Sequence, residues 1–284
     1  MSEFSVEWLA LREPYDQRAR NPKVLAAVAA ALQHRSSIAV VDLACGTGSM
    51  LRAISPRLPA VQAWRLVDND IGLLARASMG AVPTGTRITT MPVDLAHDFE
   101  SILDEVTDLV TCSALLDLVS ADWLDRFVVE VALRKLPAYV ALTYDGRATL
   151  EPADPLDDAV VGAVNLHHRR DKGFGPALGP AAAGEAMARF KRLRYRLTRG
   201  RSDWVFGARD QKIQLEILAG WAGAACETGR LPLADTMEWL TRRRDLIAGG
   251  RSILRVGHID FFATPIGNRR AERSQSNNTS SSSG

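Results

Sequence analysis

One short segment constrains the fold of this chain more than any other. Residues 40–48 read Val-Val-Asp-Leu-Ala-Cys-Gly-Thr-Gly, an apolar run that passes into a glycine turn. A short apolar run bounded by turn residues is typical of a buried parallel strand. Gly46 and Gly48 lack a Cβ atom, so the backbone there can adopt positive φ and approach a ligand closely. A helix that follows such a turn presents free N–H donors to an anion.

The chain around this segment alternates between apolar runs and helix-forming stretches. Strands are predicted at 38–43, 63–67, 87–91, 108–112 and 138–144, and helices at 22–34, 49–55, 71–78 and 121–135. This alternation predicts an α/β fold, with a doubly wound parallel sheet and helices on both of its faces.

The pattern is less regular after Tyr144. Helices are predicted at 179–191, 209–227 and 235–247, and strands at 195–198 and 253–263. We therefore expect an N-terminal helical segment over 1–37 and a main domain over 38–267, with a helical insertion at about 146–190. Residues 268–284 lack the apolar groups that offset the entropy of ordering, which predicts a disordered tail.

Composition excludes several classes of protein. The 284 residues carry a formal net charge of +2, which does not by itself indicate nucleic acid or a membrane surface as a partner. No apolar run approaches the length of a membrane span, and the N-terminal residues carry acids where a signal peptide needs bases. The three cysteines have neither a disulfide framework nor a metal-ligand spacing. We expect a cytoplasmic protein without a metal site.

Three acidic residues follow successive predicted strands. Asp42 ends the first strand, Asp68 the second, and Asp94 comes directly after the third. Because ligands of open α/β sheets bind at the carboxyl ends of the strands, we expect these acids to line one crevice. A nicotinamide dinucleotide site needs a third glycine three residues after Gly48, where this chain has Leu51.

These segments resemble the class I S-adenosylmethionine-dependent methyltransferases. VVDLACGTGSML resembles their first motif, RLVDNDIGLLARA their ribose-binding motif, PVDL their adenine-contacting motif, and DLVTCS their fourth-strand motif. The closing strand VGHIDFFAT is similar to their reversed last strand. Ala44 stands where many members carry a glycine. The resemblance implies a Rossmann-like, seven-stranded sheet with an antiparallel last strand, and S-adenosylmethionine as the cofactor. It implies that the cofactor site includes Asp42, Ala44, Gly46, Gly48, Asp68, Asn69, Asp94, Leu95 and Ser113.

The N-terminal segment adds further expectations for this cofactor site. Many family members have an N-terminal helix that covers the cofactor, so the resemblance implies that residues 1–37 form a helical lid. By this resemblance, we expect Tyr15 to pack near the sulfonium, and Arg12 or Arg20 to pair with the methionine carboxylate.

The expected reaction is methyl transfer to oxygen or nitrogen of a small molecule. The methyl group of the sulfonium is already activated, so the enzyme mainly aligns the reactants, and a general base leaves no fixed motif. On the acceptor side the candidates for a catalytic role are Tyr144, Asp145 and His167. His167 and His168 are adjacent on a predicted helix and point about 100° apart, so we expect them not to face one pocket together. Ser113 and Asp117, which follow the fourth strand, are further candidates for the acceptor side, and the alternative for them is a helix cap and a solvated face.

Two alternative functions remain open. Residues 189–201 hold seven Lys or Arg side chains and no acid, as an RNA or protein methyltransferase would use. Basic and apolar residues also alternate within this run, as they do in a strand with one buried face. The basic face of that strand would then meet solvent or the acidic segment 151–158. The other alternative is a non-catalytic module that binds the cofactor, which the three strand-end acids disfavour.

Overall fold

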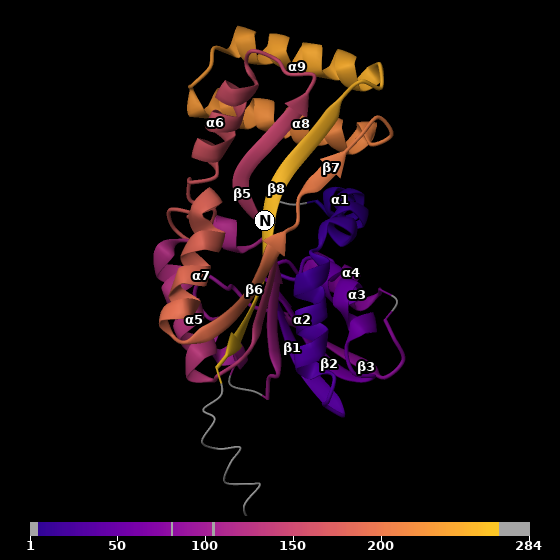
Figure 1. The fold of residues 1–284 in the computed structure, drawn as a ribbon, viewed down its shortest axis with the longest axis vertical. Helices are drawn as coiled ribbons and strands as arrows, with labels where there is room; N and C mark the ends of the chain where they lie inside the picture. The colour runs from indigo at the N-terminus through magenta and orange to yellow at the C-terminus, as the bar shows by residue number, and fades with distance from the viewer. Residues whose placement is uncertain (1–4, 81, 104–105, 267–284) are drawn as a thin grey trace, which may run out of the picture.

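The computed structural model describes residues 5–80, 82–103 and 106–266, so the tail predicted over 268–284 lies outside the described residues. One eight-stranded sheet forms the centre of this part of the chain (Figure 1). Its strands are β1 (Ser37–Leu43), β2 (Val61–Asp68), β3 (Thr86–Pro92), β4 (Leu109–Ser113), β5 (Ala138–Glu151), β6 (Tyr195–Arg201), β7 (Trp204–Phe206) and β8 (Ile253–Pro265).

The strand order is β3-β2-β1-β4-β5-β8-β6, with β7 paired to β8 beside this path. Strands β1 to β5 are parallel to one another, whereas β8 is antiparallel to β5 and to β6. The predicted Rossmann-like sheet with an antiparallel last strand is therefore confirmed. The short strand β7 is an addition to the seven expected strands.

Helices cover both faces of the sheet, as the sequence predicts (Figure 1). Side chains of β1 alternate between the two faces, and Val40 and Val41 belong to different buried clusters. The helices are α1 (Val6–Ala19), α2 (Pro22–Leu32), α3 (Ser49–Ile54), α4 (Ile71–Ser78), α5 (Ala121–Leu133), α6 (Asp157–His167), α7 (Ala182–Arg192), α8 (Gln211–Thr228) and α9 (Leu233–Ala248). Helices α2, α3 and α4 pack on the Val40 side, and α5 and α7 pack on the Val41 side.

A third cluster lies where β5 and β8 extend beyond the rest of the sheet, at the top of Figure 1. It joins these strand ends to β7, α6, α8 and α9, around the buried side chains of Phe206, Trp239 and Leu254. Helices α8 and α9 come from later in the chain than the insertion expected at about 146–190. That domain boundary stays a prediction.

Strand β5 is longer than the sequence predicts. The pair Asp145-Gly146 resembles a turn, so the strand was expected to end at Tyr144. Instead, the pairing with β8 shifts register between Tyr144 and Ala148, and Gly146 has a φ of 82°. An irregularity of this kind bends a strand without ending it. The upper half of β5 thereby carries the sheet into the third cluster.

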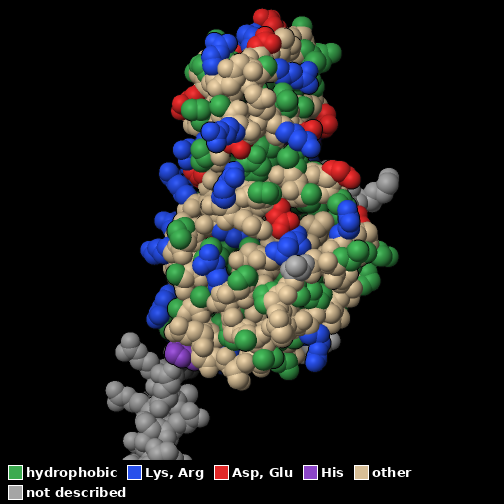
Figure 2. All heavy atoms as spheres, turned by 90° about the vertical axis from the view of Figure 1, so that its right-hand side faces the viewer, with side chains coloured by type: hydrophobic (Ala, Val, Ile, Leu, Met, Phe, Trp, Pro, Cys, Tyr) green, Lys and Arg blue, Asp and Glu red, His purple; other side chains and the backbone are tan. Residues whose placement is uncertain are grey.

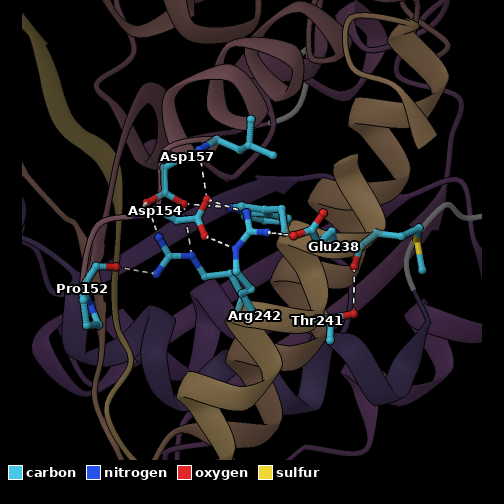
Figure 3. A network of polar contacts seen from close by, with 10 residues as sticks. Pro152, Asp154, Asp157, Glu238, Thr241 and Arg242 are labelled. Atoms are coloured by element: carbon cyan, nitrogen blue, oxygen red, sulfur yellow. Dashed lines mark hydrogen bonds and ion pairs between the residues drawn. The ribbon is translucent and has the colours of Figure 1, made fainter. Parts of the chain in front are cut away.

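Acidic residues after β5 pair with α9 (Figure 3). Asp154 accepts hydrogen bonds from Arg242, and Asp157 pairs with the fully buried Arg243. The expectation that the 151–158 segment could meet the basic run 189–201 is therefore wrong for these two acids. Their charges are compensated by arginines that follow much later in the sequence.

Candidate functional site

The turn after β1 has the backbone that its glycines predict. Gly46 and Gly48 have φ values of 54° and 82°, in the left-handed region that favours glycine. Ala44 also has positive φ, 51°, although it carries a Cβ atom. At Gly48 a Cβ atom would lie 3.4 Å from the Cβ atom of Ala77, so this position has little room for a side chain. The turn thus brings backbone N–H groups close to the carboxyl ends of the strands.

A cleft of about 530 Å³ opens at this edge of the sheet. It brings together most of the residues that the sequence assigns to a cofactor site. The predicted residues in its lining are Ala44, Gly46, Asp68, Asn69, Asp94, Leu95 and Ser113. The ends of the four successive strands β1, β2, β3 and β4 therefore contribute to one cleft. The predicted Gly48 is not in its lining.

Asp68 links β2 to the glycine turn. Its carboxylate accepts a hydrogen bond from the backbone N–H of Gly46 at 2.9 Å and another from that of Asp70 at 3.0 Å. Burial raises the pKa of Asp68, while these N–H groups lower it. Each carboxylate oxygen has a second lone pair, so Asp68 can still accept hydrogen bonds from a ligand in the cleft.

Asp42 lies beside this cleft and not in it. It lines a small adjoining pocket of about 40 Å³, whose lining shares Arg12, Gly46 and Ser113 with the larger cleft. One carboxylate oxygen accepts a hydrogen bond from the Thr111 hydroxyl at 2.8 Å, and the other, Oδ2, is buried with no hydrogen-bond partner. Burial raises the pKa of Asp42 to about 7.

Asp94 and Leu95 form the β3 side of the cleft. The Asp94 carboxylate accepts a hydrogen bond from the backbone N–H of Ala96, which lowers its pKa, and it also contacts the His97 ring. The Leu95 side chain is buried, and its carbonyl accepts a hydrogen bond from the Trp123 indole at 2.6 Å. Asp94 is thus the exposed acid of the cleft, whereas Asp68 is the buried one.

Helix α1 contributes Leu9 and Arg12 to both the cleft and the small pocket. Its Glu13 accepts two hydrogen bonds from Arg52 of α3, at 2.6 and 2.7 Å, and Arg52 also donates to the carbonyl of Thr47. This bidentate ion pair fastens α1 to the glycine turn. Whether residues 1–37 act as a lid stays a prediction.

Tyr15, expected near the sulfonium, and Arg20, offered as a partner of the methionine carboxylate, both lie outside the two cavities. Tyr15 packs edge-on against Phe206 and donates a hydrogen bond to Asp210, and it lines neither the cleft nor the small pocket. Arg20 is buried beside Tyr139 and is also absent from both linings. Of the two arginines that the sequence offered for a ligand carboxylate, only Arg12 reaches this region.

A second pocket of about 620 Å³ adjoins the cleft. The two cavities have four residues in common in their linings, which are Arg12, Ala114, Leu118 and Lys172. Beyond this common wall, the second pocket is enclosed by α1, the upper parts of β5 and β8, the end of α6, and α8.

Two of the three candidates for a catalytic role line this second pocket. Tyr144 and His167 line it, but Asp145 does not, because its carboxylate is held by Arg147. His168 lines the pocket together with His167, so the expectation that the two rings would not face one pocket is wrong. Helix α6 ends at His167, and the pocket surrounds this helix end.

Sequence reasoning missed the loop 171–174, which lines the cleft with Asp171, Lys172, Gly173 and Phe174. The Asp171 carboxylate accepts hydrogen bonds from the backbone N–H groups of Gly173 and Gly175. The Gly/Pro-rich sequence was the available signal for such a loop, but it contains no motif that indicates a ligand. Among the described residues, no group of three or more His, Cys, Asp or Glu side chains is arranged to hold a metal ion.

Comparisons with known proteins found similar structures. No family model and no curated protein sequence matches this chain. The YcgJ protein from Bacillus subtilis is similar over 86% of this chain and 99% of its own, with 15% identity and a TM-score of 0.48. A SAM-dependent methyltransferase from Geobacter sulfurreducens, in complex with S-adenosyl-L-homocysteine, is similar over 94% and 100%, with 17% identity and a TM-score of 0.46. One from Thiobacillus denitrificans, with the same ligand, is similar over 93% and 100%, with 16% identity and a TM-score of 0.45.

Proposed function

We propose that this protein is an S-adenosylmethionine-dependent methyltransferase that acts on oxygen or nitrogen of a small molecule. The observation that carries the proposal is the single cleft that gathers Gly46, Asp68, Asp94 and Ser113 from the ends of four strands and their loops. Its position follows the general rule for ligands of open α/β sheets.

The unsatisfied polar atoms of this region suit the proposed cofactor. Asp42 Oδ2 and Ser113 Oγ are both buried without a hydrogen-bond partner. They would accept from the amino group at the amino-acid end, beside the N–H groups of the glycine turn. Asp68 would accept from the ribose hydroxyls, and Asp94 and Leu95 would contact the adenine. When bound, this cofactor supplies an electrophilic methyl group. The protein's part is to orient the reactants and exclude water.

The structure also bears on the alternatives. Leu51, at the position where a nicotinamide site needs glycine, is fully buried in α3. Arg189 of the basic run pairs with Asp125 and Glu185, so part of its charge is compensated. Figure 2 shows Lys and Arg side chains along the height of one face, interspersed with acidic and apolar ones. We therefore prefer a small molecule over RNA as the acceptor.

No helix in the described ranges has the length and apolarity needed to cross a membrane.

The test is the effect of Asp68→Ala on the binding of S-adenosylhomocysteine, measured by titration calorimetry. The substitution removes a charged acceptor of ribose hydrogen bonds. Since hydrogen bonds to charged groups are worth about 1.5–3 kcal/mol, we expect affinity to fall about 10- to 100-fold.

Asp70→Ala is the matched control for this test. Asp70 caps α4 through a hydrogen bond to the Leu73 N–H and does not line the cleft. Its loss is expected to lower stability by roughly 1 kcal/mol while S-adenosylhomocysteine affinity stays the same. Equal affinity in the wild type and Asp68→Ala would reject the ribose assignment, and no binding to the wild type would reject the proposed function.

A further inference from the structure

We propose that the second pocket binds the methyl acceptor, that this acceptor is a largely apolar aromatic molecule with a hydroxyl group, and that Asp117 accepts the hydroxyl proton. The inference rests on the proposed function, which it extends from the cofactor to the substrate. It depends on where Asp117 lies, on its unpaired atoms, and on the aromatic walls around it.

Asp117 stands at the junction of the two cavities. The turn after β4 runs from Ala114 to Leu118, and these two residues line both the cleft and the second pocket. Asp117 lies on the same turn and lines the second pocket only. A group that Asp117 holds is therefore next to the wall that separates the acceptor side from the cofactor side.

Three buried polar atoms at and around Asp117 have no hydrogen-bond partner. The residue is only 5% exposed, yet its Oδ1 atom makes no hydrogen bond. His168 Nδ1 lies 3.8 Å from Asp117 Oδ2, too far for a hydrogen bond, and it is unpaired as well. His258 Nδ1, in the same pocket, is also buried and unpaired. Because unpaired buried polar atoms are costly, this cluster is suited to a ligand that brings a donor.

The remaining walls of the pocket are mostly apolar and aromatic. The ring centroids of Tyr144 and His168 are 4.7 Å apart, and those of Trp204 and His258 are 4.6 Å apart. Flat side chains favour a flat ligand, because stacked and edge-on rings gain contact area. The aromatic rings in the lining are those of Trp8, Tyr144, His167, His168, Trp204, Trp221 and His258.

Asp117 is the best base in this cluster at neutral pH. Burial raises the pKa of Asp117 to about 6, and it lowers the pKa of His168 to about 4 and that of His258 to about 3. A base is most effective when its pKa is close to the working pH. The titratable or charged groups on the surrounding elements are Arg12, Cys112, Tyr144, His167, His168, Lys172, Glu216, Glu227 and His258.

The proton and the bonds balance with one base. The hydroxyl proton passes to Asp117 Oδ1, and the oxygen keeps the electron pair of its O–H bond. That oxygen forms one bond to the methyl carbon as the carbon–sulfur bond of the sulfonium donor breaks, which leaves a methyl ether and a neutral thioether. The proton on Asp117 is released to solvent after the products leave.

Helix α8 leaves the volume for such a ligand open. Gly220 and Gly223 lie three residues apart on α8 and both line the pocket. A Cβ atom built on either glycine meets no atom within 4 Å. A larger side chain at Gly220 would therefore occupy the pocket and leave the helix backbone in place.

The test uses 2-naphthol as the probe, with 2-methoxynaphthalene as its analogue without a donor. Binding is measured by quenching of tryptophan fluorescence in the presence of S-adenosylhomocysteine, whose own binding is measured on the same samples. We expect 2-naphthol to bind about tenfold more tightly than its ether at pH 7.5. This preference should decline below pH 6, where Asp117 becomes protonated while the probe stays neutral.

Two variants test the Asp117 carboxylate and the volume of the second pocket independently. Asp117→Asn is expected to retain binding of the ether but to reduce the preference for 2-naphthol to about two- to threefold, and to remove its pH dependence. Gly220→Phe is expected to abolish binding of both probes. Its matched control is Gly162→Phe on α6, where a Cβ atom also has open space but which lies outside the second pocket.

The outcomes distinguish this inference from the proposed function. Equal binding of the two probes, or unchanged binding in Gly220→Phe, would overturn the acceptor site even if S-adenosylhomocysteine binds normally. Conversely, loss of S-adenosylhomocysteine binding with the naphthol preference intact would reject the cofactor assignment and leave a hydroxyl-selective aromatic pocket.

Discussion

Replacing Arg243 with methionine is expected to lower the free energy of unfolding by about 3–5 kcal/mol. Arg243 is fully buried in α9, where it pairs with Asp157 and donates to the Pro152 carbonyl at 2.7 Å. Asp157 is itself buried and also accepts a hydrogen bond from the Trp239 indole. Removal of the guanidinium would leave the carboxylate without its countercharge in the interior, which costs far more than the lost contact alone.

Arg242→Met is the matched control, because it removes the neighbouring arginine of the same network (Figure 3). Arg242 pairs with Asp154 and Glu238, but its side chain is 39% exposed, so water compensates for much of what is lost. Urea unfolding should therefore show a much smaller change for Arg242→Met than for Arg243→Met. Similar changes for the two variants would show that the buried pair does not determine the stability of this region.

The same comparison shows whether the acceptor pocket depends on α9. Asp157 begins α6 and His167 ends it, so the Arg243 pair supports the helix that carries two pocket residues. The cleft proposed for the cofactor is lined by no residue of α6 or α9. We expect Arg243→Met, in conditions where it is still folded, to weaken the binding of 2-naphthol and to leave that of S-adenosylhomocysteine unchanged.

The cleft that we propose for the cofactor could be predicted from sequence as a meeting place of strand ends, because local signals there agree. Parallel strands end at one edge of the sheet, so residues that follow them meet without any knowledge of tertiary packing. Gly48 and Asp42 are absent from the lining of the cleft, and for Asp42 the register of the strands explains the absence. Asp42 is paired with Leu66, so Asp68 lies two residues further along its strand than Asp42 does. The three acids therefore lie at the same edge of the sheet, but Asp42 does not line the cleft that Asp68 and Asp94 line.

The second pocket could be predicted only in part, because long-range packing decides which of the candidate residues meet there. For Asp117 the sequence left open an acceptor-side role or a solvated position after a strand, whereas the structure buries it in a pocket that residues of β5, α6 and α8 also line. His167 and His168 reach one pocket because α6 ends there, which helical spacing alone does not indicate. Tyr15 packs against Phe206 and Asp210, both nearly 200 residues away, and no local pattern encodes that contact.

Asp42→Asn is expected to stabilise the ligand-free protein at pH 8 by on the order of 2 kcal/mol. The Asp42 pKa is about 7 in the folded protein against 3.8 for an ordinary aspartate, because burial disfavours its charge. The penalty for that charge is absent below about pH 4, grows as pH rises, and is complete above pH 7. Asp42 Oδ2 has no hydrogen-bond partner, so the amide group that replaces it would be buried without one. The cost of this unpaired group offsets part of the gain in stability. Thermal unfolding between pH 4 and pH 8 would show the difference between the two proteins increasing with pH.

The same substitution should weaken the ligand that the carboxylate is proposed to hold. Because an amide carries no charge, we expect Asp42→Asn to bind S-adenosylhomocysteine at least tenfold more weakly at pH 8, so stability and binding change in opposite directions. Asp108→Asn is the control, since Asp108 lies at the other end of β4, where it pairs with Arg35 and accepts from the Ala39 N–H. It should lower stability and leave binding intact. A stability gain without a loss of affinity would show that Asp42 is a buried structural acid and does not contact the cofactor.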